Sequence, residues 1–233
     1  EDGISPAEMM DAIGRLIVKA GLVGTLDPTT VLYRGRIRRP SDTWEPGPDS
    51  LGAPPADLAR SGRMNPTGIP YLYLALDLDT MLAEVGSLHQ DEVVPAGVYM
   101  PTKAIRVVDF TTLPEVPSLF DPDRSSLFDE LVFLRGFVRE ISTPVERPRL
   151  DDIHYAPTQV MCEYLAQALE LPNGDSVDGI LYPSAAKSGG KNLALFPARS
   201  LTGARFDAVT LVEVRQWTEV LARSAVSGQS QVA

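Results

Sequence analysis

The sequence predicts an α+β fold, in which short strands and helices follow one another with loops of uneven length between them. Residues 71–76 alternate strictly, so Tyr71, Tyr73 and Ala75 share one face of a strand and three leucines share the other, the face expected to meet the core. From Asp77, which is well placed as an N-cap, apolar residues recur at helical spacing instead. Twenty prolines and 18 glycines among 233 residues indicate many turns.

The remaining elements are predicted from the same two periodicities and from the turn residues between them. Helices are expected at residues 6–20, 78–88, 126–138, 155–169 and 218–225. Strands are expected at residues 31–37, 71–76, 93–100, 104–110, 178–183, 192–196 and 208–214. Ser5 and Glu8 stand three residues apart around Pro6, a spacing typical of a capping box at the start of the first helix. Ser125 or Ser126 is expected to cap the helix that follows it.

Two proline-rich connections lie between these elements. Residues 40–55 form a connection longer than most loops, and loops of that length are commonly lids or mobile segments. We expect Trp44 to pack this loop against the body of the protein, with the capping of a cleft as the alternative. Residues 113–123 are also predicted to form a loop.

The charge is negative overall but uneven along the chain. A net charge of −10 argues against a broad nucleic-acid footprint, which needs a basic face. Residues 31–63 nevertheless hold six arginines and four acidic residues, a local charge of +2. Guanidinium groups bind phosphate through a planar, bidentate fork, so an arginine pocket in an acidic protein suits a small anionic ligand. For Arg36, Arg38 and Arg39, pairing with surface carboxylates is the preferred interpretation.

Several classes of site are not predicted. The single cysteine, Cys162, cannot form an intrachain disulfide and stands among apolar residues, which favours a buried structural role over a nucleophile. His89 and His154 have no second ligand or nucleophile at a recognisable spacing, so no metal site is expected. No apolar run is long enough to cross a bilayer, and the first residues do not resemble a secretory signal. We therefore expect a soluble cytoplasmic protein.

Three side chains are candidates for chemistry from their positions alone. Arg63 stands among turn residues and is expected on a loop. Glu84 falls at the edge of its helix's apolar stripe, where a carboxylate can rim a cleft, although an ordinary solvated glutamate has the same spacing. Ser184 begins a small-residue turn whose amides and hydroxyl can bind a ribose or phosphate, although serine also forms turns without such a role. The glycines that follow Ser184 do not form a P-loop.

Two blocks of residues resemble the RES-domain family. The first is an R-x-N…G…Y…E pattern formed by Arg63, Asn65, Gly68, Tyr73 and Glu84. The second consists of Tyr155, Pro157, Thr158, Gln159, Asp178, Gly179, Ile180, Tyr182, Pro183, Ser184, Asn192, Leu193, Leu195 and Phe196. The resemblance spans about residues 31–200 and implies a split β core with surrounding helices, similar to the diphtheria-toxin-like ADP-ribosyltransferases.

The resemblance also implies an activity and a set of residues. Family members break NAD, so the expected reaction is cleavage of the nicotinamide–ribose bond and transfer of ADP-ribose to a protein target, phosphate or water, without a metal. Arg63 and Arg34 would bind the pyrophosphate, Tyr73 would stack against the nicotinamide, Glu84 would act on its ribose, and Ser184 would orient that ribose. Further NAD-binding residues implied in this way are Tyr33, Asn65, Tyr182 and Asn192.

The resemblance implies partners as well. Such proteins are largely toxins neutralised by a Xre-like antitoxin that itself binds DNA, so an antitoxin partner is expected, together with a homodimer. The domain prediction is an N-terminal helical extension (residues 1–30), a RES domain (31–217) with an insertion at 113–152, and a C-terminal helix and tail (218–233). In one departure from the family, Met64 stands where an aromatic residue is common.

Two other functions fit parts of the sequence. A catalytically silent module could use the same cleft to hold a nucleotide or a peptide, with the glutamate in a structural role. Release of nicotinamide by the pure protein distinguishes this module from an enzyme. A nuclease toxin would want a basic surface and clustered histidine, glutamate and lysine, which the acidic composition and two scattered histidines do not favour.

Overall fold

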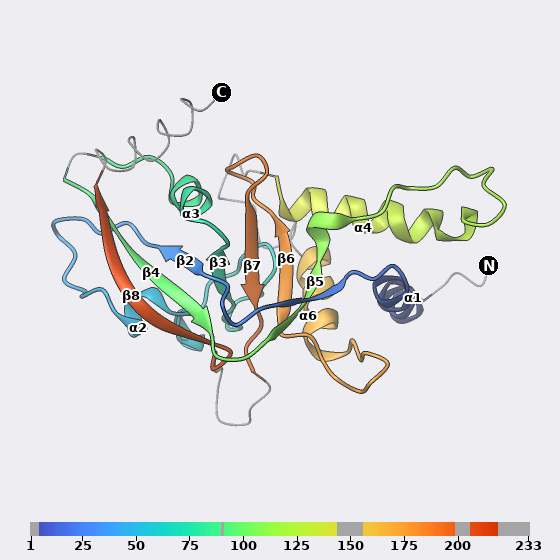
Figure 1. Ribbon diagram of the computed structural model, residues 1–233, viewed down its shortest axis with the longest axis horizontal. Coiled ribbons are helices and arrows are strands. Elements are labelled where there is room, and N and C mark those ends of the chain that lie inside the picture. Colours follow the sequence, from blue (N-terminus) through green and yellow to red (C-terminus); the bar gives the residue numbers. More distant parts are fainter. Residues whose placement is uncertain (1–4, 90, 144–155, 199–205, 219–233) are drawn as a thin grey trace.

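The computed structural model describes residues 5–89, 91–143, 156–198 and 206–218 and has the predicted α+β architecture (Figure 1). The helices are α1 (Pro6–Lys19), α2 (Pro48–Leu51), α3 (Leu78–Val85), α4 (Phe128–Ile141) and α6 (Ala156–Gln167), with single 3₁₀ turns at Ala56–Leu58, Phe110–Thr112 and Ser125–Leu127. The strands are β1 (Val23–Leu26), β2 (Leu32–Gly35), β3 (Leu72–Ala75), β4 (Val93–Pro101), β5 (Ile105–Asp109), β6 (Gly179–Pro183), β7 (Lys191–Leu195) and β8 (Val209–Thr218).

The eight strands form one sheet in the order β1-β5-β6-β7-β3-β2-β4-β8. Its neighbouring strands are antiparallel except for β5 and β6, which are parallel. Helices α1, α4 and α6 lie beside the β5–β6 end of the sheet, and α3 lies beside β2 and β3 (Figure 1). Two separate groups of helices therefore cover the sheet. Helices α1, α4 and α6 cover it near β5 and β6, and α3 covers it near β2 and β3.

Both faces of the central strand β3 are buried. Leu72 and Leu74 pack on one face with Leu32 and Tyr99, as the alternation predicted for the leucines. The other face is also covered, because Tyr71 packs in the cluster formed with α1, α4 and α6. Ala75 packs there against α3. The face of β3 that carries the tyrosines is thus covered by α1, α4 and α6 near Tyr71 and by α3 near Ala75.

The sheet is nearly divided between β2 and β3. These strands pair at one position, Tyr33 opposite Ala75, whereas β2 pairs with β4 over four residues. Beyond that pair a side chain joins the two strands in place of backbone pairing, because Arg34 Nη1 donates to the carbonyl of Tyr73 at 3.0 Å. The division opens the sheet beside α3 and is the position of the candidate site.

Several predicted boundaries hold and others are wrong. The capping box of α1 is present, with reciprocal bonds between Ser5 and Glu8. The predicted serine cap of α4 is wrong, because a 3₁₀ turn precedes that helix and its N-cap is Leu127, without a side-chain bond. Helix α3 ends at Val85 instead of residue 88, since Gly86 follows with a φ of 84°.

At the two chain ends the structure differs from the prediction in extent. Strand β1 was not predicted; it pairs with β5 and extends the sheet. Strand β8 continues to Thr218, so that residue belongs to a strand, and the helix predicted over 218–225 otherwise lies outside the described residues. Trp44 packs on Arg36 and Arg38, which follow β2 and precede the loop, with the guanidinium of Arg36 4.7 Å from the ring centroid.

Candidate functional site

A cleft of about 390 Å³ opens at the division between β2 and β3. Seven of the residues predicted for the site line it: Tyr33, Arg34, Arg63, Tyr73, Glu84, Tyr182 and Asn192. The two others are Asn65 and Ser184, which hydrogen-bond to residues that line the cleft. Asn65 bonds to Tyr73, and Ser184 bonds to Glu84. The structure therefore brings together all nine predicted residues, which come from β2, β3, α3, β6, β7 and two loops.

Glu84 lies in the last turn of α3 with one carboxylate oxygen held in place. Its Oε1 accepts hydrogen bonds from Ser184 Oγ and from Asn192 Nδ2, each at 2.6 Å. Among the described residues no group donates to Oε2. The carboxylate is oriented by two side chains and keeps one oxygen available for a ligand in the cleft.

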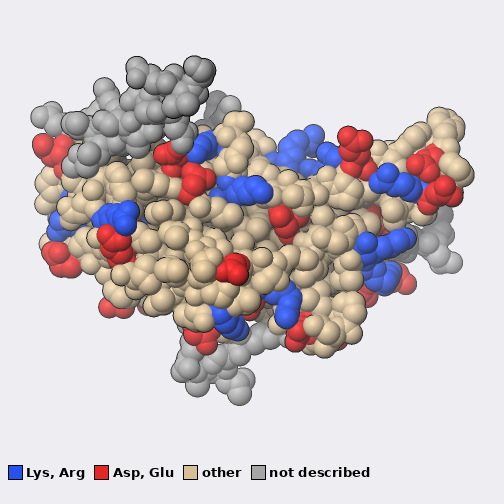
Figure 2. Space-filling model, viewed as in Figure 1, with Lys and Arg blue, Asp and Glu red and all other residues tan. Residues whose placement is uncertain are grey.

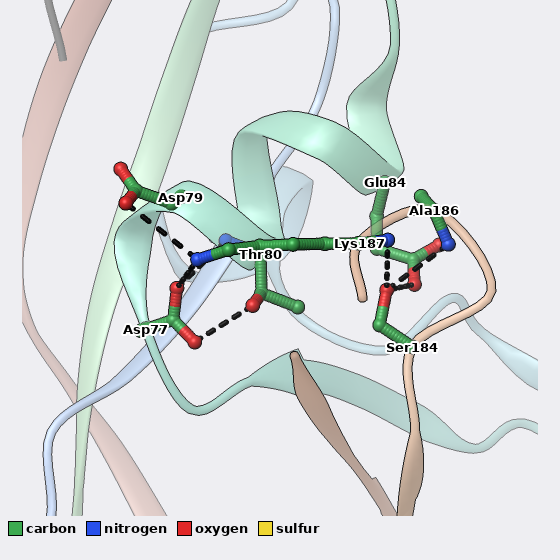
Figure 3. Close-up of polar contacts among 7 residues, drawn as sticks. All are labelled: Asp77, Asp79, Thr80, Glu84, Ser184, Ala186 and Lys187. Atoms are coloured by element: carbon green, nitrogen blue, oxygen red, sulfur yellow. Dashed lines mark hydrogen bonds and ion pairs between the residues drawn. The ribbon is translucent and has the colours of Figure 1, made fainter. Parts of the chain in front are cut away.

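Ser184 is itself held by the turn that it begins (Figure 3). Its Oγ accepts from the backbone N–H groups of Ala186 and Lys187, both at 3.1 Å, while donating to Glu84. The two amides occupy the acceptor positions of the oxygen, so the hydroxyl proton is directed at Glu84. The serine can therefore position the carboxylate without itself being free to rotate.

The same turn is fastened to the beginning of α3 (Figure 3). Lys187 Nζ lies 3.0 Å from Asp77 Oδ1 and 3.5 Å from Asp79 Oδ2. Asp77 also caps α3 by accepting from the backbone N–H of Thr80. Although partial burial opposes the effect, bonds from Thr80 and Lys187 lower the pKa of the Asp77 carboxyl. Lys187 was not among the residues predicted for the site. The signal for it in the sequence is a single lysine within a turn of small residues.

Two guanidinium groups line the cleft without a carboxylate partner. Arg34 is partly buried, and burial lowers its pKa, yet an arginine stays protonated in proteins. Arg63 Nη1 donates to the carbonyl of Ile141, the last residue of α4, at 3.1 Å. Neither arginine forms an ion pair within the described part of the chain. Partly buried cations without an ion-pair partner attract an anionic ligand.

The loop that carries Arg63 is fixed from α6. Thr158 Oγ1 donates to the carbonyl of Arg63, and Gln159 Nε2 donates to the carbonyl of Gly62 at 2.8 Å. Thr158 and Gln159 belong to the second block of the sequence pattern, so these hydrogen bonds join the two blocks directly. The expected loop position of Arg63 is confirmed, and its backbone is held by a helix about 95 residues further along the chain.

Tyrosine rings form the remaining wall of the cleft. Tyr73 donates its hydroxyl to Asn65 Oδ1 at 2.7 Å, and Asn65 Nδ2 donates to the carbonyls of Arg60 and Ile69. Asn65 is thus engaged in the loop and supports Tyr73 instead of lining the cleft. Burial raises the pKa values of Tyr73 and Tyr182, so both phenols are neutral at physiological pH.

Other sequence expectations concern groups away from the cleft. Cys162 is buried, and burial raises the pKa of its thiol, as expected of a structural cysteine. The expected surface pair is present for Arg38 with Glu45, whereas Arg39 pairs with Glu92, which is buried. For Arg36 the expected pair is wrong, because its guanidinium stacks on Trp44 and has no carboxylate partner within the described residues. Over the described ranges, no group of three or more His, Cys, Asp or Glu residues could hold a metal ion. No helix in those ranges combines the length and apolar character needed to cross a membrane.

Fold and site together define an α+β protein with a divided sheet, in which a positioned carboxylate shares a cleft with two unpaired guanidinium groups. The chain belongs to the RES domain family, whose model matches residues 34–221. The RES domain is associated with NAD-related toxin–antitoxin systems. No curated protein and no solved structure gives a match to this chain. The resemblance noted in the sequence is thereby confirmed at the level of the family.

Proposed function

We propose that this protein cleaves NAD at the nicotinamide–ribose bond and transfers ADP-ribose to an acceptor. The observation that carries the proposal is the Glu84 carboxylate, which lines the cleft, is held at Oε1 by Ser184 and Asn192, and has no donor to Oε2 among the described residues. Membership of a family associated with NAD-related systems supports NAD as the substrate. The two unpaired guanidinium groups in the same cleft match its pyrophosphate.

The proposed reaction places positive charge where Glu84 can oppose it. The bond between ribose C1′ and the nicotinamide nitrogen breaks, and its electron pair leaves with nicotinamide, which becomes neutral. The sugar then resembles an oxocarbenium ion, as in glycoside hydrolysis. A preorganised carboxylate beside it stabilises that charge and can accept a hydrogen bond from the 2′-hydroxyl. The acceptor's nucleophilic atom forms the new bond to C1′ and loses its proton.

The remaining cleft residues have roles that follow from their chemistry. In the proposal, Arg34 and Arg63 bind phosphate oxygens, Tyr73 stacks against the nicotinamide ring, and Ser184 keeps Glu84 directed at the ribose. Tyr33, Tyr182 and Asn192 complete the NAD-binding wall. Met64, which stands where an aromatic residue is common, is buried and lines the cleft. Its side chain has no aromatic ring, so stacking is assigned to the tyrosines.

Family membership also supports proposals about partners and setting. We propose a toxin that acts in the cytoplasm, is neutralised by a Xre-like antitoxin and forms a homodimer, with no direct contact to nucleic acid. Acidic and basic side chains are interspersed over the face seen in Figure 2, and this mixed charge supports the proposal of no direct contact to nucleic acid. We further propose that the near division of the sheet corresponds to the split β core of diphtheria-toxin-like ADP-ribosyltransferases.

The test is nicotinamide release by the purified protein incubated with NAD. We expect turnover by the wild type and a loss of about 10²- to 10³-fold in Glu84→Gln, the range for removal of one preorganised electrostatic group. Glu170→Gln, which changes an exposed glutamate outside the cleft, is the matched control and should retain activity. Mass spectrometry of the ADP-ribose product, with and without phosphate and lysate, identifies the acceptor.

Two outcomes would contradict the proposal. Wild-type turnover by Glu84→Gln would remove this carboxylate from the reaction. Binding of NAD without nicotinamide release would instead indicate a catalytically silent nucleotide-binding module.

A further inference from the structure

Arg34 lies where two hollows of the protein meet. On one side is the cleft of about 390 Å³ that contains Glu84. On the other is a larger groove of about 1120 Å³, lined by most of the residues between Asp49 and Ser61 and by Arg36 and Thr67. Arg34 lines this groove too. The near division of the sheet makes this arrangement possible, because the Arg34 guanidinium reaches across from β2 to the carbonyl of Tyr73 in β3.

The cleft by itself is small for a dinucleotide. Pockets that enclose drug-sized ligands have volumes of about 300–1,000 Å³, and 390 Å³ lies near the lower limit. One nucleoside with its phosphate suits such a space better than two nucleosides. The second half of a dinucleotide therefore needs room beyond Arg34, and the groove offers it.

The groove offers polar groups suited to a nucleotide. Two more guanidinium groups line it, from Arg36 and Arg60, together with hydroxyls of Ser50, Ser61 and Thr67. Arg36 is held in place, since its guanidinium stacks on Trp44 and donates to the carbonyl of Ser50 at 3.3 Å. Arg60 is exposed, and within the described residues its side chain forms no hydrogen bond or ion pair. Asp49 and Asp57 leave the groove with a small positive charge.

We propose that this groove binds the adenosine monophosphate half of the dinucleotide, with the pyrophosphate at Arg34 between the two hollows. The inference rests on the proposed function and adds a second binding site to it. A dinucleotide consists of two nucleosides joined by a pyrophosphate, and a partly buried cation between two adjoining hollows matches that order of groups. Arg60 contacts the adenosine half from the far side of Arg34 and does not approach the bond that breaks.

The test compares NAD with nicotinamide mononucleotide, which has the same scissile bond but lacks the adenosine half. In Arg60→Gln we expect KM for NAD to rise about 10-fold with kcat unchanged, the loss of one charge-assisted hydrogen bond. The value of kcat/KM for the mononucleotide should stay at the wild-type level. The double variant Arg36→Gln/Arg60→Gln should raise KM for NAD further. Arg124→Gln, at an exposed arginine that lines neither hollow, should leave both substrates unaffected.

An unchanged KM for NAD in the double variant would overturn the proposal. An equal rise in KM for both substrates would also overturn it, because Arg60 would then act on the reacting half. Slower transfer to an acceptor at unchanged KM for NAD would assign the groove to the acceptor instead.

Failure of the proposed function can be told apart from failure of this inference. If the wild type releases nicotinamide from neither substrate, the proposed function is wrong. Calorimetry then measures the affinity for AMP and tests the groove independently of any reaction. Binding that weakens about 10-fold in Arg60→Gln supports the site. Equal affinity of both proteins, or no binding of AMP to the wild type, overturns it.

Discussion

At the scale of single residues, the site depends on side chains that hold other side chains. Tyr73 presents its ring to the cleft, but its hydroxyl is directed to Asn65 Oδ1 behind it. Asn65 in turn donates to three backbone carbonyls of the Arg63 loop, those of Arg60, Pro66 and Ile69. The ring of Tyr73 thus has a role in binding, and its hydroxyl has a role in holding the loop.

The variant Tyr73→Phe separates those two roles. We expect the free energy of unfolding in urea to fall by about 1–2 kcal/mol, because a buried acceptor on Asn65 loses its donor. NAD turnover should stay within a few-fold of the wild type, since the ring remains. Tyr33→Phe is the control for the unfolding measurement alone, because within the described residues the Tyr33 hydroxyl has no hydrogen bond. A loss of turnover as large as that of Tyr73→Ala would place the hydroxyl in the chemistry.

At the scale of elements, helix α3 and the turn over residues 184–190 behave as one unit. Lys187 binds the beginning of the helix through Asp77, and Ser184 binds Glu84 near its end. The helix is short, so these two contacts help to set its position relative to β6 and β7, together with the packing of Met81 and Leu82 on the sheet. The ion pair is remote from the cleft and acts on Glu84 through the turn.

We therefore expect Lys187→Met to lower kcat for NAD by about 1.4- to 5-fold with KM unchanged. The size follows from a partly exposed ion pair, which contributes about 0.2–1 kcal/mol. Lys187→Arg should restore most of the rate because it keeps the charge. Lys191→Met is the control, since Lys191 is exposed and forms no ion pair in the described ranges. A rise in KM without a change in kcat would indicate that Lys187 touches the substrate instead.

At the scale of the whole molecule, the sheet holds the two halves of the site in register. Asn192 on β7 reaches Glu84 because β7 pairs with both β3 and β6. That pairing requires a close approach at Gly179 of β6, where an added Cβ would lie 2.4 Å from the carbonyl oxygen of Ala194. A backbone atom cannot move aside as a side chain can.

Gly179→Ala should consequently lower the free energy of unfolding by about 3 kcal/mol or more, or prevent folding. Chemical denaturation followed by circular dichroism measures the loss. The matched control is Gly24→Ala on the edge strand β1, where an added Cβ meets nothing within 4 Å. That change should be neutral or slightly stabilising, because alanine restricts the unfolded chain. Equal stability of the two variants would show that the β6–β7 contact tolerates a side chain.

Features that depend on neighbours along the chain were accessible from the sequence. Alternation located β3, and the change of period with Asp77 as cap located α3. Ser5 and Glu8 identified the start of α1 for the same local reason. Local signals failed where they were weak, as at β1, and where a 3₁₀ turn replaced a serine cap, as at α4.

The sequence by itself determined the α+β class, most of its elements and, through the family pattern, the residues to consider for the site. Only the tertiary structure decided that Ser184 and Asn192, 100 and 108 residues beyond Glu84, donate to the same oxygen. It also decided that Asn65 supports Tyr73 and that Arg34 borders two hollows. The physical reason is that periodicity specifies which face of an element is buried, whereas the partner on that face is set by packing between distant segments.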